Sequence, residues 1–340
     1  MVMNMELNYN QIKSITNGAV RITQEEDGFH FFRFTQEQED LYLIHRESGL
    51  HRNTFSTSGV QMRFKTDSTK LRLSINTFKG NNRNYFAMDV LVNNRRIGSI
   101  ANYNEENLPL VYTVEKFPFG EFSGEFDLGE GMKEVKILFP WSVKTVLQKI
   151  SLDENAMLEG IKPKHKLLCF GDSITQGYDS LHPSNKHMNK LADFLDAEEF
   201  NKAIGGEKFF PELAKAKETF DPDVIVVGYG TNNWTWSTKE ELTADCNQFY
   251  KNLHETYPKA NIYALAPLWR KDSVEPSKAG EFSGVAKIIE QAVANYENVT
   301  FIQPIDFVPH EEPFYADLKV HPNDRGFEAY YQNLTKIIHL

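Results

Sequence analysis

Four short segments of the sequence carry residues that could do chemistry together. Ser173 lies in F-G-D-S-I-T-Q-G, directly after a short apolar run and before a predicted helix. A serine hydroxyl becomes a nucleophile once a base removes its proton, and the N–H groups of a helix start favour developing negative charge. His321, in D-L-K-V-H-P-N-D, is the candidate base, because imidazole accepts and returns a proton near neutral pH. Ser173 and His321 are thus a candidate pair of nucleophile and general base.

Three further residues could support this chemistry. Asp317 could orient the imidazole ring of the base. Asn232, in G-T-N-N-W, could donate a hydrogen bond into a cleft, and the glycine pair that ends at Gly206 lets the backbone turn with a free N–H. Each segment taken alone also fits ordinary structure, as a helix cap, a turn or a loop histidine. The four in this order, each at a strand end, favour the catalytic interpretation.

The elements that must position these segments are strands that alternate with helices. Near-continuous apolar runs, typical of strands buried on both faces, occupy 167–170, 224–230, 262–268 and 299–305. Helical patterns occupy 238–257, 279–297 and 324–338. This alternation predicts a doubly wound α/β domain whose ligands bind beyond the carboxyl ends of its strands.

The first half of the chain has a different pattern. Alternating or β-branched segments predict strands, and no convincing amphipathic helix precedes about residue 150; the segments are 59–66, 70–78, 84–92, 95–102 and 133–139. Asn93-Asn94 suggests a tight hairpin between two of them. We therefore expect an all-β jelly-roll sandwich over residues 1–155 as an accessory domain, and the catalytic α/β domain over 156–340.

The order of the four segments resembles the SGNH hydrolases, also called the GDSL esterase/lipase superfamily, over about residues 164–340. The four marker residues of that superfamily match Ser173, Gly206, Asn232 and His321. The resemblance implies a flavodoxin-like three-layer α/β/α domain with Ser173 as nucleophile and His321 as base. It also implies an oxyanion hole made of the backbone N–H groups of Ser173 and Gly206 and the side-chain amide of Asn232.

Two positions depart from the pattern of that superfamily. Asn233 stands where members usually carry an aspartate, so we expect a changed loop network with catalysis retained. Asp317 and His321 enclose three residues where two are usual. Asp317 orients the ring if the turn absorbs the extra residue. Otherwise a backbone carbonyl or another acid orients His321 and leaves a Ser–His dyad.

Composition excludes several classes of function. Among the 340 residues, 37 Lys and Arg face 47 Asp and Glu, a net charge of −10 that argues against general binding of nucleic acids or anionic membranes. Cys169 and Cys246 are the two cysteines, so neither a disulfide framework nor a thiolate metal site is expected, and no cofactor is predicted. No apolar stretch approaches the roughly 18 residues of a membrane helix, and no leader is recognisable, so we expect a cytoplasmic protein.

Four side chains near strand ends are the expected substrate contacts: Trp234, Tyr178, Arg270 and Trp269. For Trp269 and for Trp236, loop packing is an equally good explanation, and for Arg270 a surface salt bridge is. A jelly roll ahead of an SGNH domain resembles certain bacterial carbohydrate esterases and related acyltransferases. We therefore expect a serine esterase that removes a short acyl group, such as acetyl, from a carbohydrate-like ester, without a metal.

The alternatives are an acyltransferase with the same residues and an inactive carbohydrate-binding protein. Homo-oligomer formation through the first half stays open.

Overall fold

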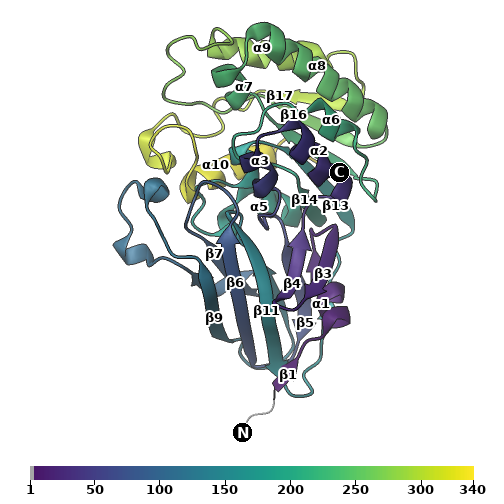
Figure 1. Ribbon diagram of the computed structural model, residues 1–340, viewed down its shortest axis with the longest axis vertical. Helices are drawn as coiled ribbons and strands as arrows, with labels where there is room; N and C mark the ends of the chain where they lie inside the picture. Colours follow the sequence, from purple (N-terminus) through teal and green to yellow (C-terminus); the bar gives the residue numbers. More distant parts are fainter. Residues whose placement is uncertain (1–3) are drawn as a thin grey trace.

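The strands of the first half pair into two antiparallel sheets that enclose one apolar core. A computed structural model describes residues 4–340 and has these sheets at the end that carries the N-terminus (Figure 1). One sheet has the order β3 (Arg21–Glu25), β4 (Gly28–Phe32), β11 (Val143–Asp153), β6 (Lys70–Lys79) and β9 (Gly120–Asp127), with β1 (Asn4–Glu6) on β11. The other has the order β12 (Glu159–Gly160), β5 (Gln61–Thr66), β10 (Lys133–Leu138), β7 (Ala87–Val92) and β8 (Arg95–Ala101), with β2 (Thr16–Asn17) on β5.

The pairing of these strands is nested. Strand β7 pairs with β8, β6 with β9, β5 with β10 and β4 with β11, all antiparallel. Alternate residues of β6, among them Leu71, Leu73 and Ile75, point into the core, as its alternating sequence predicts. Asn93 and Asn94 both have positive φ, at 49° and 64°, which confirms the tight hairpin between β7 and β8.

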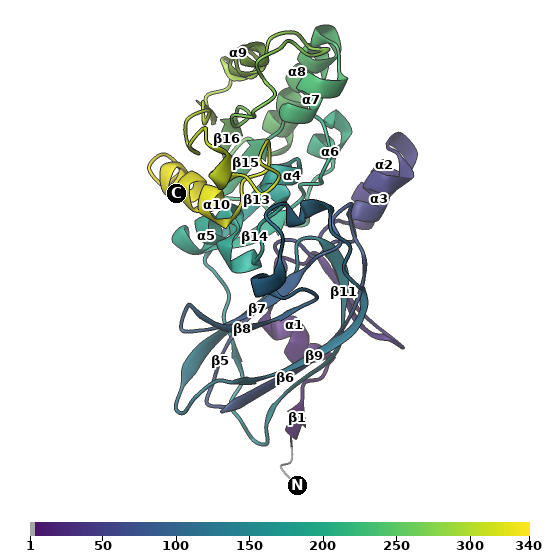
Figure 2. The ribbon, with the colours of Figure 1, turned by 90° about the vertical axis from the view of Figure 1, so that its left-hand side faces the viewer.

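The first half also contains three short helices, which corrects the expectation of none: α1 (Tyr9–Ile15), α2 (Gln36–His45) and α3 (Ser48–Asn53). Their brevity hides them from periodicity, but two of them begin with a capping box. Asn8 and Thr35 each accept a hydrogen bond from the backbone N–H three residues on, and the glutamine there bonds back to the cap. Helices α2 and α3 lie between β4 and β5 in sequence and reach up beside the second half of the chain (Figure 2).

The second half forms a parallel sheet covered by helices on both faces. Its order is β14 (Ala197–Asn201), β13 (His165–Gly171), β15 (Val224–Gly228), β16 (Asn261–Leu265) and β17 (Val299–Ile302). Numbered along the chain this order is 2-1-3-4-5, the doubly wound order of flavodoxin-like sheets. The fold is thus mixed α/β with three sheets. Since β12 still pairs with β5, the chain leaves the antiparallel sheets only after Gly160, later than the boundary expected at residue 155.

Two apolar cores hold the helices against the parallel sheet. Leu168 and Phe170 of β13 face one core, while Leu167 and Cys169 face the other, which is why the strand is apolar throughout. The first core is covered by α6 (Pro211–Lys215), α8 (Lys239–Thr256) and α9 (Phe282–Val293), the second by α5 (His187–Phe194) and α10 (Asp324–Leu334). Two short helices, α4 (Ser173–Gln176) and α7 (Thr231–Trp236), follow β13 and β15. Within residues 4–340 no helix is both long and apolar enough to cross a membrane.

The two halves meet through a buried polar junction. The Arg33 side chain, 1% exposed, follows β4 and donates to the backbone carbonyls of Asn201 at 2.5 Å and Ala203 at 3.1 Å. It also donates to the carbonyls of Ser56 at 2.5 Å and Asn53 at 3.2 Å. Burial lowers the pKa of Arg33 to about 10. The guanidinium thus ties loops of both halves together through carbonyl dipoles.

Replacing Arg33 by methionine tests this junction. Arg33→Met leaves several buried carbonyls without a donor, so we expect the free energy of unfolding to fall by about 3 kcal/mol or more. Urea unfolding followed by circular dichroism measures the change. The exposed Arg95 gives a matched control, and Arg95→Met should alter stability by less than about 0.5 kcal/mol. An unchanged unfolding midpoint for Arg33→Met would contradict this role.

Candidate active site

The turn between β13 and α4 presents Ser173. Asp172 caps the helix, and its Oδ1 accepts the Ile174 N–H at 3.0 Å. A Cβ on Gly171 would lie 2.3 Å from Thr175 Oγ1, so only glycine fits this tight strand-to-helix turn. Ser173 is therefore held at the carboxyl end of a central strand, where the sequence predicts the cleft.

His321 lies beside Ser173 although 148 residues separate the two. The imidazole Nε2 is 2.8 Å from Ser173 Oγ, and Nδ1 is 2.7 Å from Asp317 Oδ2. Nδ1–H donates to the carboxylate in this arrangement, which leaves Nε2 to accept the serine proton. The three side chains form one hydrogen-bonded chain, the geometry of an activated serine.

The loop before His321 accommodates its extra residue by a left-handed turn. Leu318 has φ of 58°, and the Ala316 N–H closes the loop by donating to the His321 carbonyl at 2.9 Å. Asp317 Oδ1 accepts the backbone N–H groups of Lys319, Val320 and His321 at 3.0, 2.8 and 3.1 Å. Burial alone would raise the pKa of Asp317, but the hydrogen bonds and charge of His321 and these N–H groups lower it below its usual range.

The loop after β14 contains the glycine pair. The Gly205 N–H donates to Gln176 Oε1 at 2.7 Å and is thereby occupied. Gly206 has φ of 88°, and within residues 4–340 its N–H has no hydrogen-bond acceptor. Asn232 Nδ2 uses one hydrogen to bond the Glu207 carbonyl at 2.9 Å, which leaves its second hydrogen available. Gly206 and Asn232 are thus linked through adjacent residues, as joint donors to an oxyanion would require.

Asn233, where the superfamily usually has aspartate, is fully buried. Its Oδ1 accepts the Phe209 N–H at 3.2 Å, which ties the segment after β15 to the loop after β14. Its Nδ2 has no hydrogen-bond partner within the described part of the chain. The side chain therefore serves the packing of the two loops.

Trp234 and Arg270, two of the four expected substrate residues, contact each other and neighbouring side chains. Trp234 was expected to line the cleft, but its ring is 3% exposed, packs edge-on against Phe282 and donates from Nε1 to the Gly280 carbonyl at 2.8 Å. Arg270 lies 4.9 Å above that ring and forms an ion pair with Asp272 at 2.6 Å. Both side chains are thus occupied inside the loop layer.

The other two expected substrate residues, Tyr178 and Trp269, also pack against neighbouring rings. Tyr178 is buried between Trp141, at 4.8 Å between ring centroids, and His321, at 5.7 Å. Trp269 stacks on His310 with centroids 5.1 Å apart. Of the four, Tyr178 alone contacts a residue of the hydrogen-bonded chain described above.

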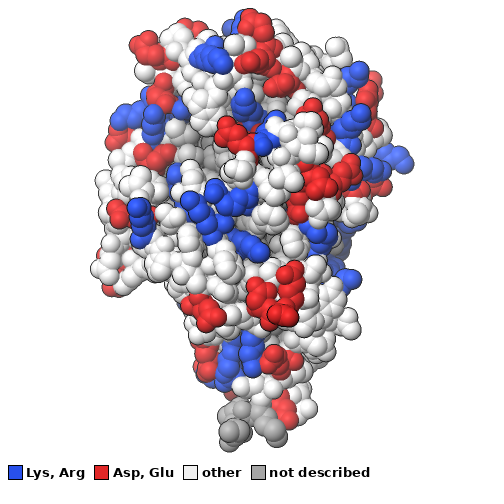
Figure 3. All heavy atoms as spheres, viewed as in Figure 1, with Lys and Arg blue, Asp and Glu red and all other residues white. Residues whose placement is uncertain are grey.

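A hollow beside Gly206 is formed jointly by the two halves of the chain. Its volume is about 540 Å³, and its lining combines α2, α3 and the loop between them with the loop after Gly206 and with Trp236: His45, Arg46, Glu47, Leu50, Gly206, Glu207, Lys208 and Trp236. The Trp236 ring is 53% exposed and Arg46 Nε is 3.0 Å from the buried Glu207. Basic side chains also gather on the molecular face in Figure 3 near mid-height, where the halves meet.

A second carboxylate lies beside His321 that the sequence pattern does not predict. Asp179 Oδ2 lies 3.5 Å from His321 Nδ1, and Arg83 from the first half forms an ion pair with Asp179 at 2.6 Å. Asp179 follows Ser173 closely, which is a weak local signal. Nothing in the spacing points to Arg83, because the packing of the two halves creates this contact.

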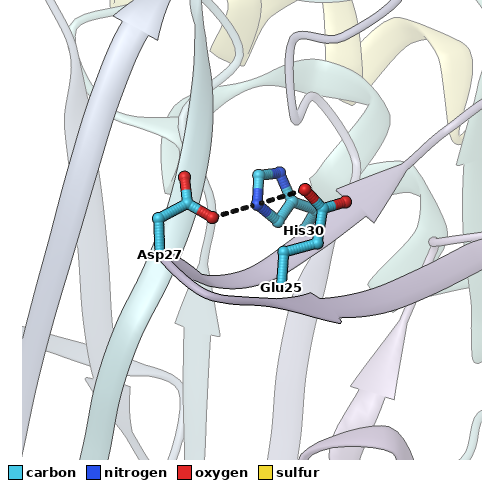
Figure 4. Close-up of side chains that lie close together, drawn as sticks. All are labelled: Glu25, Asp27 and His30. Carbon is cyan, nitrogen blue, oxygen red and sulfur yellow. Dashed lines mark hydrogen bonds and ion pairs between the residues drawn. The ribbon is translucent and has the colours of Figure 1, made fainter.

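Two groups of described residues have the donor set of a cation site. One is Asp179, Asp317 and His321, but both ring nitrogens of His321 are already engaged, with Ser173 and with Asp317. The other is Glu25, Asp27 and His30 at the hairpin between β3 and β4 (Figure 4). There His30 Nε2 is 2.8 Å from Asp27 and 3.6 Å from Glu25, so a hydrogen bond from a buried histidine to Asp27 accounts for the cluster.

Residues 169–329 match the GDSL-like lipase/acylhydrolase family. No curated protein matches the sequence.

Several solved structures share the fold over both halves. The salicylyl-acyltransferase SsfX3 from a tetracycline biosynthetic pathway has a TM-score of 0.80 at 17% identity, over 98% of this chain and 96% of its own. A protein described as GDSL-like lipase from Bacteroides ovatus has 0.76 at 16%, over 99% and 98%. The acetyl xylan esterase Est2A from the rumen bacterium Butyrivibrio proteoclasticus has 0.61 at 14%, over 99% and 97%. The match over residues 169–329 and the 2-1-3-4-5 sheet together support the SGNH superfamily for the second half of this chain, whose four marker residues match Ser173, Gly206, Asn232 and His321.

Proposed function

We propose that this protein is a serine esterase that removes a short acyl group, such as acetyl, from a carbohydrate-like ester. The observation that carries the proposal is the continuous chain of hydrogen bonds from Asp317 through His321 to Ser173, with distances of 2.7 and 2.8 Å. A serine activated in this way attacks ester carbonyls, and the chemistry needs no redox step.

The reaction proceeds in two halves. His321 Nε2 takes the proton as Ser173 Oγ attacks the carbonyl carbon, and the oxyanion is held by the N–H groups of Ser173 and Gly206 and by the Asn232 amide. His321 then gives the proton to the leaving alcohol oxygen, the ester C–O bond breaks, and an acyl-enzyme remains. Water attacks this ester, His321 takes its proton and returns it to Ser173, and the carboxylic acid leaves.

The hollow beside Gly206 is the proposed site for the sugar. Exposed tryptophan faces pack well on the apolar faces of sugar rings, and Trp236 offers such a face. Arg46 and Lys208 add donors for hydroxyl groups. The likeness to an acetyl xylan esterase supports this substrate class.

The first half is proposed to be a jelly roll, because the nested pairing of β4 to β11 supports that topology. In this arrangement its insertion, α2 and α3, forms one wall of the sugar site. The carbohydrate ester is the proposed ligand, with no nucleic-acid or membrane partner. A cytoplasmic location is part of the proposal, since Cys169 and Cys246 are both buried free thiols.

An acyltransferase is the second candidate, supported by the likeness to a salicylyl-acyltransferase. The two functions share every step up to the acyl-enzyme and differ in whether water or another alcohol meets it. Product analysis with candidate acceptor alcohols separates them. If Ser173 cannot be labelled by a fluorophosphonate while glycans bind, the third alternative, an inactive carbohydrate-binding protein, is supported instead.

Removing the nucleophile should abolish hydrolysis. Ser173→Ala is expected to lower kcat for p-nitrophenyl acetate by about 10³-fold or more, because no covalent intermediate can form. Release of p-nitrophenol measures this, and the exposed Ser14 provides the control variant Ser14→Ala, which should keep full activity. Equal rates for Ser173→Ala and the wild type would sink the proposal.

Replacing Asp317 tests its hydrogen bond to His321. Asp317→Asn is expected to lower kcat by about 10²-fold or more, because the amide no longer stabilises the imidazolium and favours the wrong tautomer. Asp221, which is 85% exposed, supplies the control variant Asp221→Asn. Steady-state kinetics at several pH values measures both variants. A kcat for Asp317→Asn within a factor of three of the wild type would speak for a dyad.

The tryptophan of the hollow should affect sugar esters selectively. We expect Trp236→Ala to raise KM for acetylated xylo-oligosaccharides by about 10-fold, which corresponds to about 1.4 kcal/mol of lost contact with the sugar ring. KM for p-nitrophenyl acetate, which has no sugar, should stay within a factor of two. Acetate release measures the first substrate, and Trp236→Tyr should recover most of the affinity. A parallel change for both substrates would argue against a sugar site there.

A further inference from the structure

An ion pair links the first half of the chain to the catalytic histidine. Arg83, in the loop between β6 and β7, donates from Nε to Asp179 Oδ1 at 2.6 Å and from Nη2 to Oδ2 at 2.7 Å. That same Oδ2 lies 3.5 Å from His321 Nδ1. A planar guanidinium held by two parallel bonds fixes its partner in position as well as in charge.

Further contacts from the first half hold Asp179 in place. The Tyr85 hydroxyl donates to Asp179 Oδ1 at 2.5 Å, and the Tyr112 hydroxyl donates to the Asp179 carbonyl at 2.6 Å. Asp179 is fully buried and has φ of 70°, a left-handed backbone that a non-glycine residue adopts only when its surroundings compensate. These contacts hold the carboxylate in one position beside the ring.

When His321 is protonated, the charges around its ring form two pairs of opposite sign. When the imidazole takes the serine proton, Asp317 supplies one negative charge, while the charge of Asp179 is offset by Arg83. Burial alone would lower the pKa of Arg83, but its hydrogen bonds with Asp179 and the Asp179 charge raise it, so the guanidinium stays charged. Loss of either member of this pair would leave one uncompensated buried charge beside the ring.

Resting on the proposed function, we propose that Arg83 and Asp179 are positioning residues that together set the charge balance at His321. The first half of the chain is then a component of the catalytic apparatus. The titratable and charged groups that surround the His321 ring come from its own loop, from both ends of α4 and from the loop between β6 and β7: Asp317, Asp172, Tyr178, Asp179 and Arg83.

The test is the acidic limb of the pH profile of kcat/KM, which reports the loss of the free base. Arg83→Met leaves the Asp179 carboxylate unpaired, favours the imidazolium and should move this limb up by about one pH unit. Asp179→Asn leaves the Arg83 cation unpaired and should move the limb down by about one unit. The double variant should return it to within about 0.3 unit of the wild type, because both charges are gone.

Matched variants separate charge from structure. Arg83→Lys keeps the cation and should hold the limb near its wild-type position. Arg72→Met breaks the surface ion pair with Glu125, 2.8 Å, on β6 and should leave the profile unchanged. Circular dichroism shows which variants fold, and Asp179→Asn carries the test if Arg83→Met does not. Limbs that stay in place, or that move in the same direction in both single variants, overturn the proposal.

A second readout keeps this inference distinct from the proposed activity. NMR of the imidazole signals, assigned with His321→Gln, follows the titration of His321 without any substrate and should show the same opposite shifts. It also separates His321 from Asp172, whose pKa burial raises to about 7. If the wild type hydrolyses no ester but the imidazole titrates as described, the proposed function fails and the charge-balancing role stands. If the NMR midpoints do not shift, the charge-balancing role fails.

Discussion

The hydrogen bond between Ser173 Oγ and His321 Nε2 is the contact on which the rest of this structure depends. It joins a turn after the first strand of the parallel sheet to a loop before the last helix, and it works only within about 3 Å. Each side is held by local backbone contacts. Gly171 allows the tight turn at Ser173, and three N–H groups fix Asp317 beneath the ring.

Around this contact the molecule uses buried polar groups where a simple two-domain protein would use an apolar interface. Arg33 binds carbonyls of both halves, and Lys202 forms a fully buried ion pair with Glu218 at 2.9 Å. Such groups add little net stability, because desolvation offsets their attraction. They do demand one geometry, since any shift leaves a charge or a carbonyl unpaired. This geometric requirement fixes Arg83 and the wall of the hollow relative to the loops that carry Ser173 and His321.

The two halves of the chain contribute different parts of the candidate site. The parallel sheet places Ser173, Gly206 and Asn232 after the carboxyl ends of its strands, and the loop before α10 adds His321. The antiparallel sheets supply long loops and the helices α2 and α3, which reach up beside the second half of the chain (Figure 2). Leu50 of α3 stands directly over Gly206, where a Cβ would come within 3.8 Å of it. The part of the chain without Ser173 thus forms one wall of the hollow.

The sequence by itself determined the features that local spacing encodes. These are the apolar strands, the glycine at the turn before Ser173, the Asn93-Asn94 hairpin and the order of the four segments. It also left the extra residue between Asp317 and His321 open, and a left-handed Leu318 resolves that turn. Only the tertiary structure decided that Trp234 packs inward while Trp236 faces the hollow, because a six-residue helix has too few turns to define its buried face. It alone decided that Arg83 reaches Asp179, because that contact depends on how two separately folded sheets pack, and no spacing along the chain records it.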